Sequence, residues 1–175
     1  MRKLLILGVG NPIVSDDRVG LAVAEELQKS PPRTVEGVEL VIDIATEGGF
    51  EFTEKLAGFD GAIIVDSIIT GECAVGTVRE IGMNDLESTS RLLTSHGVGF
   101  KSAVEFGRTI GLKMPDENSI RILTVEIEDN LTVSEEMHPD VTKAVNEVSE
   151  CISSIVQEDG FLQHCGDKAA TDIVN

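Results

Sequence analysis

The amino-acid sequence predicts an α/β fold with three layers: a mostly parallel, twisted sheet of about five strands with helices on both faces. Short apolar runs alternate with segments whose apolar residues recur at helical spacing, which is typical of this class. Hydrophobic residues make up 41% of the 175 residues, enough to form a core. No repeat or linker divides the chain, so we expect one domain over residues 1–157 and a loose tail over 158–175.

Five short segments are expected to form strands. Residues 3–8 are a continuous apolar run that ends at a glycine, as in a strand buried on both faces. Residues 61–65 are wholly apolar and are expected near the centre of the sheet. Residues 76–81 alternate more and are expected at an edge or in a hairpin. Residues 38–44 and 120–127 complete the set.

Four segments are expected to be helical. Residues 16–29 have acidic residues in the first turn, with Ser15 or Asp16 as N-cap, and two prolines follow the end. The other three segments are 49–57, 99–110 and 139–155. Residues 82–95 are polar and irregular, so we expect a surface loop or a frayed helix there.

Charge and composition exclude several classes of protein. Acidic residues outnumber basic ones by 31 to 14, which gives a net charge of −17 and argues against binding to nucleic acid or anionic membranes. The apolar runs are far shorter than the roughly 20 residues that span a bilayer, and no secretory signal is recognisable. We therefore expect a cytoplasmic protein with no membrane segment. Three cysteines without a CxxC pair argue against a disulfide framework or a thiolate zinc site.

The loop after the first predicted strand contains Gly8-Val9-Gly10-Asn11-Pro12-Ile13, where a dinucleotide-binding fingerprint would begin. Ile13 occupies the position of the third glycine, and Pro12 lacks the backbone N–H that would bind a pyrophosphate. The glycines therefore predict a tight turn. A nucleotide-binding oxidoreductase remains an alternative.

Two acids and one histidine are candidate metal ligands. Asp16 and Asp17 stand where the first helix is expected to begin, although one acid suffices as a cap. Asp66 ends an apolar run at the edge where open α/β sheets bind ligands, and a carboxylate there needs a cation, a proton or several N–H donors. His96 precedes a predicted helix. Two carboxylates and one imidazole suit a divalent ion such as nickel, zinc or iron, whereas His138 is expected to be solvated.

The order and spacing of these motifs resemble those of the hydrogenase maturation endopeptidases. Those proteins trim a C-terminal extension from the large subunit of nickel–iron hydrogenases. The resemblance covers roughly residues 3 to 157. It rests on the following motifs: Leu4-Leu5-Ile6-Leu7-Gly8-Val9-Gly10-Asn11, Asp16-Asp17 with Gly20, Gly48-Gly49, Ile64-Val65-Asp66 and Ser95-His96-Gly97-Val98-Gly99.

The resemblance implies that Asp17, Asp66 and His96 are both metal ligands and catalytic residues. The metal would be nickel presented by a hydrogenase large-subunit precursor, with zinc or cadmium as surrogates. Family members commonly carry Glu at the position of Asp17, so Asp16 and Asp17 both remain open as the first ligand. The residues expected to bind substrate are Gly10, Asn11, Gly48, Gly49 and Gly97.

A phospho-receiver signalling domain is the main alternative outside the enzymes. Such a domain also has an acidic pair after its first strand and an acceptor aspartate after its third. Here Asp16 and Asp17 lie too far beyond the first strand, and residues 125–128 contain no lysine to bind a phosphoryl group. The endopeptidase therefore remains the leading hypothesis.

Overall fold

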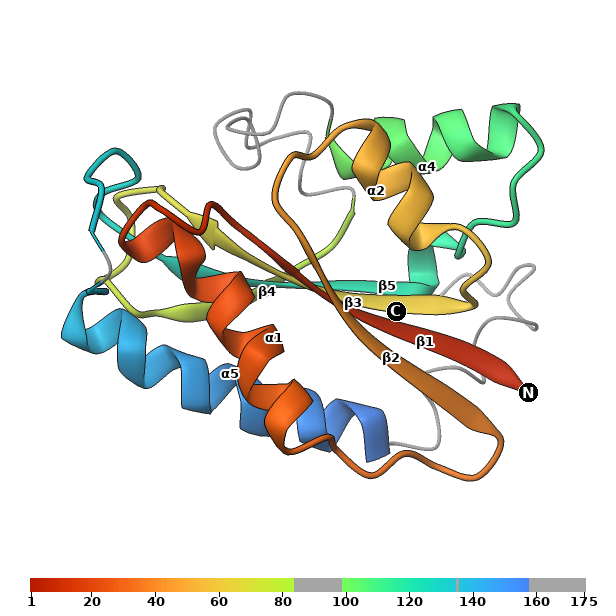
Figure 1. Ribbon diagram of the computed structural model, residues 1–175, viewed down its shortest axis with the longest axis horizontal. Coiled ribbons are helices and arrows are strands. Elements are labelled where there is room, and N and C mark those ends of the chain that lie inside the picture. Colours follow the sequence, from red (N-terminus) through yellow and green to blue (C-terminus); the bar gives the residue numbers. More distant parts are fainter. Residues whose placement is uncertain (84–98, 135, 158–175) are drawn as a thin grey trace, which may run out of the picture.

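The computed structural model describes residues 1–83, 99–134 and 136–157. Within these ranges, five strands form one sheet in the order β2-β1-β3-β5-β4 (Figure 1). The four parallel strands are β1 (Arg2–Val9), β2 (Val38–Ala45), β3 (Gly61–Ile68) and β5 (Ile120–Glu126). Strand β4 (Val78–Ile81) runs antiparallel to β5 and forms the predicted edge.

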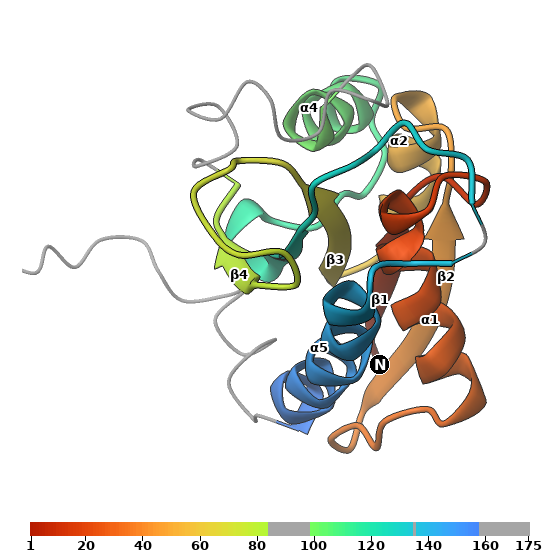
Figure 2. The same ribbon diagram turned by 90° about the vertical axis from the view of Figure 1, so that its left-hand side faces the viewer.

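Helices cover both faces of the sheet, as Figure 2 shows. One face is covered by α1 (Val19–Lys29) and α5 (Pro139–Gln157), and the other by α2 (Phe50–Leu56) and α4 (Phe100–Thr109). Two 3-10 turns, η1 (Asp16–Arg18) and η3 (Glu117–Ser119), lead into α1 and β5. The predicted three-layer α/β fold is confirmed. Among the described residues, no helix combines the length and the apolar character needed to cross a membrane.

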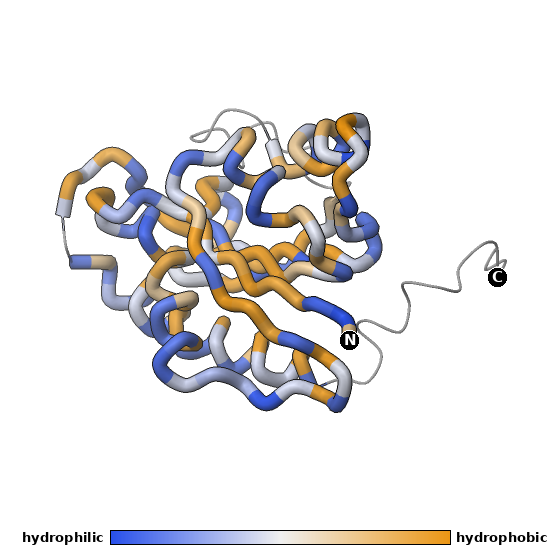
Figure 3. The backbone as a smooth tube through the Cα atoms, turned by 45° about the vertical axis from the view of Figure 1, so that its right-hand side comes forward, coloured by the Kyte–Doolittle hydropathy of each residue, from blue (hydrophilic) through white to orange (hydrophobic). Residues whose placement is uncertain are grey.

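The side chains of the central strands alternate between two apolar cores. Ile6 and Ile63 lie in the core against α1 and α5, whereas Leu7 and Ile64 lie in the core against α2 and α4. All eight residues of β3 are buried, and Figure 3 shows hydrophobic residues gathered along the strands at the centre of the molecule. The wholly apolar run therefore forms the middle strand, as its sequence predicted.

The third strand is longer than predicted, and this changes the setting of Asp66. Strand β3 continues to Ile68, because Asp66 and Ile68 pair with Thr124 and Glu126 of β5. Asp66 thus lies inside the strand rather than after its last residue. Backbone pairing does not depend on side-chain polarity, so a hydrophobic pattern alone misses this extension.

The first helix begins later than predicted. Asp16 and Asp17 belong to η1, and α1 begins at Val19 with Arg18 as its N-cap and no side-chain capping bond. Ser15 is the N-cap residue of η1, as one of the two alternatives had it, but its side chain makes no capping bond and donates instead to the carbonyl oxygen of Glu136. The expectation that Asp16 caps the helix is wrong, because its carboxylate accepts a hydrogen bond from the His138 N–H. The loop or frayed helix expected over 82–95 lies outside the described residues beyond its first two positions, and the tail expected over 158–175 lies outside them entirely.

Glycines bring α1 into direct contact with the sheet. A side chain at Gly20 would place its Cβ 2.2 Å from the carbonyl oxygen of Val9 and 2.4 Å from that of Val65. A Cβ at Gly8 would lie 2.1 Å from the carbonyl oxygen of Gly20. The first turn of α1 therefore lies directly on β1 and β3, and η1, which precedes it, is held at the same edge of the sheet.

Candidate functional site

The candidate site lies at the carboxyl edge of the sheet, between β1 and β3. The chain places β2 on one side of β1 and β3 on the other, which makes this a topological switch point, the place where open α/β sheets bind ligands. Strand β1 pairs with β3 only as far as Gly8 and Val65, whereas β3 continues to Ile68. Turn η1 lies beside this extension of β3, joined to it by a bond between Asp17 and Ser67.

Asp17 and Asp66 are brought together through Ser67. The Ser67 hydroxyl donates a hydrogen bond of 2.6 Å to Asp17 Oδ1. The Ser67 backbone N–H donates a hydrogen bond of 2.8 Å to Asp66 Oδ1. Both carboxylates therefore lie beside Ser67, and because Asp17 is 5% exposed and Asp66 is 3% exposed, they have little access to water.

The electrostatics of this pair favour a proton or a cation. Burial raises the pKa of Asp66 well above its ordinary value of 3.8, and the nearby charge of Asp17 raises it further. The hydrogen bond from the Ser67 N–H opposes both effects. Because desolvated like charges repel, such a pair is most stable when it holds a proton or binds a cation. These oxygen donors therefore fit a divalent metal ion.

Asp16 is equally buried but has a different role. Its Oδ1 accepts a hydrogen bond of 2.6 Å from the backbone N–H of His138 and one of 3.4 Å from the Ser15 hydroxyl. The bond from His138 ties the loop after β1 to the segment that precedes α5. The His138 side chain is exposed, as predicted. Of the two acids left open by the sequence, Asp17 is the one beside Asp66.

The predicted third ligand, His96, and its neighbour Gly97 lie outside the described residues. Across residues 1–83, 99–134 and 136–157, no group of three His, Cys, Asp or Glu side chains is arranged to hold a metal ion. Because side chains alternate along a strand, Asp66 belongs to the same face of β3 as Ile64, which packs in the core against α4. The helix that follows His96 in the chain thus covers the face that carries Asp66.

The other predicted substrate-binding residues shape two loops at this edge. A Cβ at Gly10 would lie 2.1 Å from a carbonyl oxygen of η1, so only glycine lets the first loop close on this turn. Gly48 and Gly49 have φ angles of 78° and 59° at the entry to α2, a conformation that favours glycine. Asn11 Oδ1 accepts a hydrogen bond of 3.2 Å from the N–H of Ile13. Binding of substrate by these residues stays a prediction.

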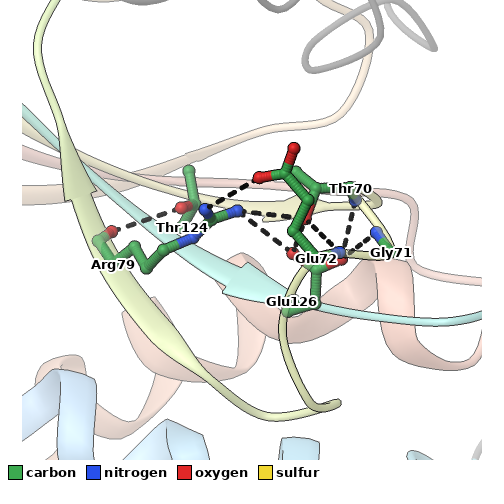
Figure 4. Close-up of polar contacts among 6 residues, drawn as sticks. All are labelled: Thr70, Gly71, Glu72, Arg79, Thr124 and Glu126. Atoms are coloured by element: carbon green, nitrogen blue, oxygen red, sulfur yellow. Dashed lines mark hydrogen bonds and ion pairs between the residues drawn. The ribbon is translucent and has the colours of Figure 1, made fainter.

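Sequence reasoning missed Glu126, a buried carboxylate at the end of β5 (Figure 4). It accepts hydrogen bonds of 2.6 and 2.8 Å from the backbone N–H groups of Thr70 and Gly71, and it forms an ion pair of 3.2 Å with Arg79 of β4. These contacts fix the loop after β3, and therefore the chain that follows Asp66. The signal in the sequence was an acidic residue between the apolar Val125 and Ile127, in the last part of a predicted strand.

Exposed apolar side chains follow three of the parallel strands at this edge. Ile13 follows β1, Phe50 follows β2, and Leu131 and Val133 follow β5. An antiparallel bridge between Val14 and Val133 holds the last of these loops against the first. A polypeptide bound at this edge of the sheet would therefore find exposed apolar side chains to contact.

Comparisons with known proteins agree with the resemblance found in the sequence. No family model matches the chain. The hydrogenase 2 maturation protease of Escherichia coli (strain K12) is 33% identical over 78 residues, which are 43% of this chain and 44% of that protein. The match therefore spans less than half of this curated relative.

Solved structures of hydrogenase maturation proteases have the same fold. The maturating endopeptidase HybD of Escherichia coli gives a TM-score of 0.69 at 24% identity, with 87% of this chain and 90% of that chain covered. The [NiFe] hydrogenase maturation protease HybD of Thermococcus kodakarensis gives 0.68 at 19% identity, with 90% and 100% covered. At these identities the structural likeness shows the fold, and together with the sequence match it confirms the predicted resemblance.

Replacing Asp66 by Asn is expected to stabilise the metal-free protein at neutral pH. Folding raises the pKa of Asp66, so the native state holds this proton more tightly than the unfolded state. The stability that the group contributes is complete below its ordinary value of 3.8 and is lost as the pH rises through the native pKa. Asn is neutral and keeps an oxygen for the Ser67 N–H, so we expect a rise in Tm of a few degrees, where about 1 kcal/mol corresponds to roughly 2–4 °C.

Thermal unfolding with a chelator between pH 4 and 8 measures this effect. The difference in Tm between Asp66→Asn and wild type should grow with pH until the native pKa is passed. Asp43→Asn is the control, because Asp43 is partly exposed and pairs with Lys55 at 2.6 Å, so its replacement should not raise Tm. An Asp66→Asn protein no more stable than wild type at any pH would refute the assignment of repulsion to this pair.

Replacing Glu126 by Ala is expected to lower the free energy of unfolding by about 2–4 kcal/mol, because Arg79 and two backbone N–H groups lose a buried acceptor. Glu80→Ala is the matched control, since the ion pair of Glu80 with Arg121 (2.6 Å) is more exposed and should change stability by less than about 1 kcal/mol. Urea unfolding measures the free energy of unfolding of both variants. Equal losses of unfolding free energy in Glu126→Ala and Glu80→Ala would contradict the account in which the buried contacts of Glu126 stabilise the fold.

Proposed function

We propose that this chain, which is similar to the hydrogenase maturation proteases in fold and over 78 residues in sequence, is an endopeptidase. Its substrate would be a nickel-loaded precursor of a hydrogenase large subunit, from which it removes the C-terminal extension. The observation that carries the proposal is the buried pair of Asp17 and Asp66 at the β1–β3 switch point. A buried pair of carboxylates is suited to recognising a cation on a partner.

The metal would arrive with the substrate. Asp17, Asp66 and His96 would supply two oxygens and one nitrogen, which leaves coordination positions for ligands from the precursor. Such an incomplete set binds a metal ion more tightly when the precursor supplies the remaining ligands than when the protein is alone, so cleavage would report that nickel has been inserted. Zinc or cadmium would act as surrogates, because both accept carboxylate and imidazole ligands.

Hydrolysis of the peptide bond requires an activated water and stabilisation of the oxyanion. When bound, the metal would supply positive charge that polarises the scissile carbonyl. Either aspartate can accept the proton of the attacking water, and the burial of both keeps competing water away. Ser67 holds Oδ1 of each carboxylate and so fixes the direction in which each group faces.

The precursor would dock at the carboxyl edge of the sheet, where the acidic pair lies. Ile13, Phe50, Leu131 and Val133 are exposed there and would pack against the apolar part of the substrate chain. The cytoplasm, where hydrogenase subunits would receive their metal, is the proposed location. No observation on the described residues favours a phospho-receiver domain or a nucleotide-binding oxidoreductase.

Incubation of the purified protein with a nickel-loaded precursor is expected to shorten the C-terminus of the precursor, as intact-mass spectrometry would show. Asp17→Ala, Asp66→Ala and His96→Ala should lower the rate by about 10²–10⁴-fold, the usual contribution of acid–base groups. Glu80→Ala is the control and should cleave as fast as wild type, because Glu80 lies on the outer edge of the sheet.

Two outcomes would refute the proposal. One is that wild type leaves a nickel-loaded precursor intact. The other is that Asp66→Ala and His96→Ala process it as fast as wild type, in which case the site is elsewhere. A precursor prepared without nickel should remain uncut. If it is cleaved as fast as the nickel-loaded precursor, the metal has no part in the reaction.

A further inference from the structure

Ser67 contacts both members of the acidic pair, and no motif in the sequence indicated it. Its hydroxyl donates to Asp17 Oδ1 at 2.6 Å, and its backbone N–H donates to Asp66 Oδ1 at 2.8 Å. Asp17 is 50 residues away in the chain, so the first bond joins two separate elements, η1 and β3. Ser67 is 8% exposed, which means that water does not replace this bond readily.

The alternation of side chains along β3 explains why a link is needed. Asp66 belongs to the face covered by α2 and α4, whereas Ser67 belongs to the face covered by α1 and α5. Turn η1 leads into α1, so it approaches β3 from the side of Ser67. A hydroxyl at position 67 can therefore reach the carboxylate of Asp17, while the amide of the same residue binds Asp66.

We propose that Ser67 is a positioning residue, which holds the Asp17 carboxylate beside Asp66 in the orientation that the reaction requires. This inference rests on the proposed endopeptidase function and goes beyond it by assigning a role to a residue between the two acids. The bond from the Ser67 hydroxyl holds the Asp17 carboxylate against β3, at the residue whose backbone N–H binds Asp66. Without the hydroxyl, Asp17 can rotate away, and a misplacement of about 1 Å at a reacting group is enough to lower the rate up to 10²-fold.

Thr53 provides a matched hydroxyl that lies outside the site. It is 2% exposed, and its hydroxyl donates a hydrogen bond of 3.0 Å to the carbonyl oxygen of Ala103, which joins α2 to α4. Loss of this bond should lower stability as much as loss of the Ser67 bond. A comparison of variants at Thr53 and Ser67 therefore separates a general effect on folding from an effect on the position of Asp17.

The test measures kcat and KM for precursor processing by wild type, Ser67→Ala, Ser67→Thr and Thr53→Val, all assayed well below the lowest Tm. Ser67→Ala is expected to lower kcat by about 10–100-fold with KM changed less than about twofold. Ser67→Thr keeps the hydroxyl and suits a strand, so it should restore kcat to within about threefold of wild type. Thr53→Val should lose stability without loss of kcat.

Each outcome decides the matter. If wild type processes the precursor and folded Ser67→Ala has an unchanged kcat, Ser67 has no positioning role although the proposed function stands. The role is also refuted if Thr53→Val loses as much kcat as Ser67→Ala, or if folded Ser67→Thr is as slow as Ser67→Ala. If wild type processes no precursor, the proposed function itself fails and the role of Ser67 fails with it.

Discussion

The burial of two like-charged carboxylates beside the middle strand is the constraint on which this site depends. Asp17 and Asp66 have little access to water, and their mutual repulsion raises the pKa of Asp66 in addition to the effect of burial. A fold selected for stability alone would avoid such a pair, because each desolvated charge is costly without a partner. Its presence at a topological switch point therefore points to a ligand that supplies positive charge.

The surrounding structure holds the pair in place against this repulsion. Close approaches that only Gly8, Gly10 and Gly20 permit bring η1 and α1 directly onto the sheet. Asp16 anchors the same loop to the backbone of His138, and Glu126 anchors the loop that follows Asp66. Packing and hydrogen bonds on both sides of the acidic pair thus oppose the repulsion between its carboxylates.

Much of the fold could be predicted from the sequence, because apolar periodicity sets both the type and the burial of each element. The runs that became β1 and β3 were predicted within a few residues, and Asp66 was predicted at the edge where open α/β sheets bind ligands. What could not be predicted depends on contacts between distant residues. The bond from His138 to Asp16 spans 122 residues, and the link from Ser67 to Asp17 spans 50, so no local pattern reports either.

The central claim is that Asp17 and Asp66 together bind a divalent cation. Crystals of the protein soaked in zinc, with anomalous diffraction recorded at the zinc edge, test it most directly. We expect one strong peak with an oxygen of each aspartate at about 2.0–2.2 Å. A peak only at exposed groups such as His138, or an ordered pair of carboxylates with no peak between them, would contradict the claim.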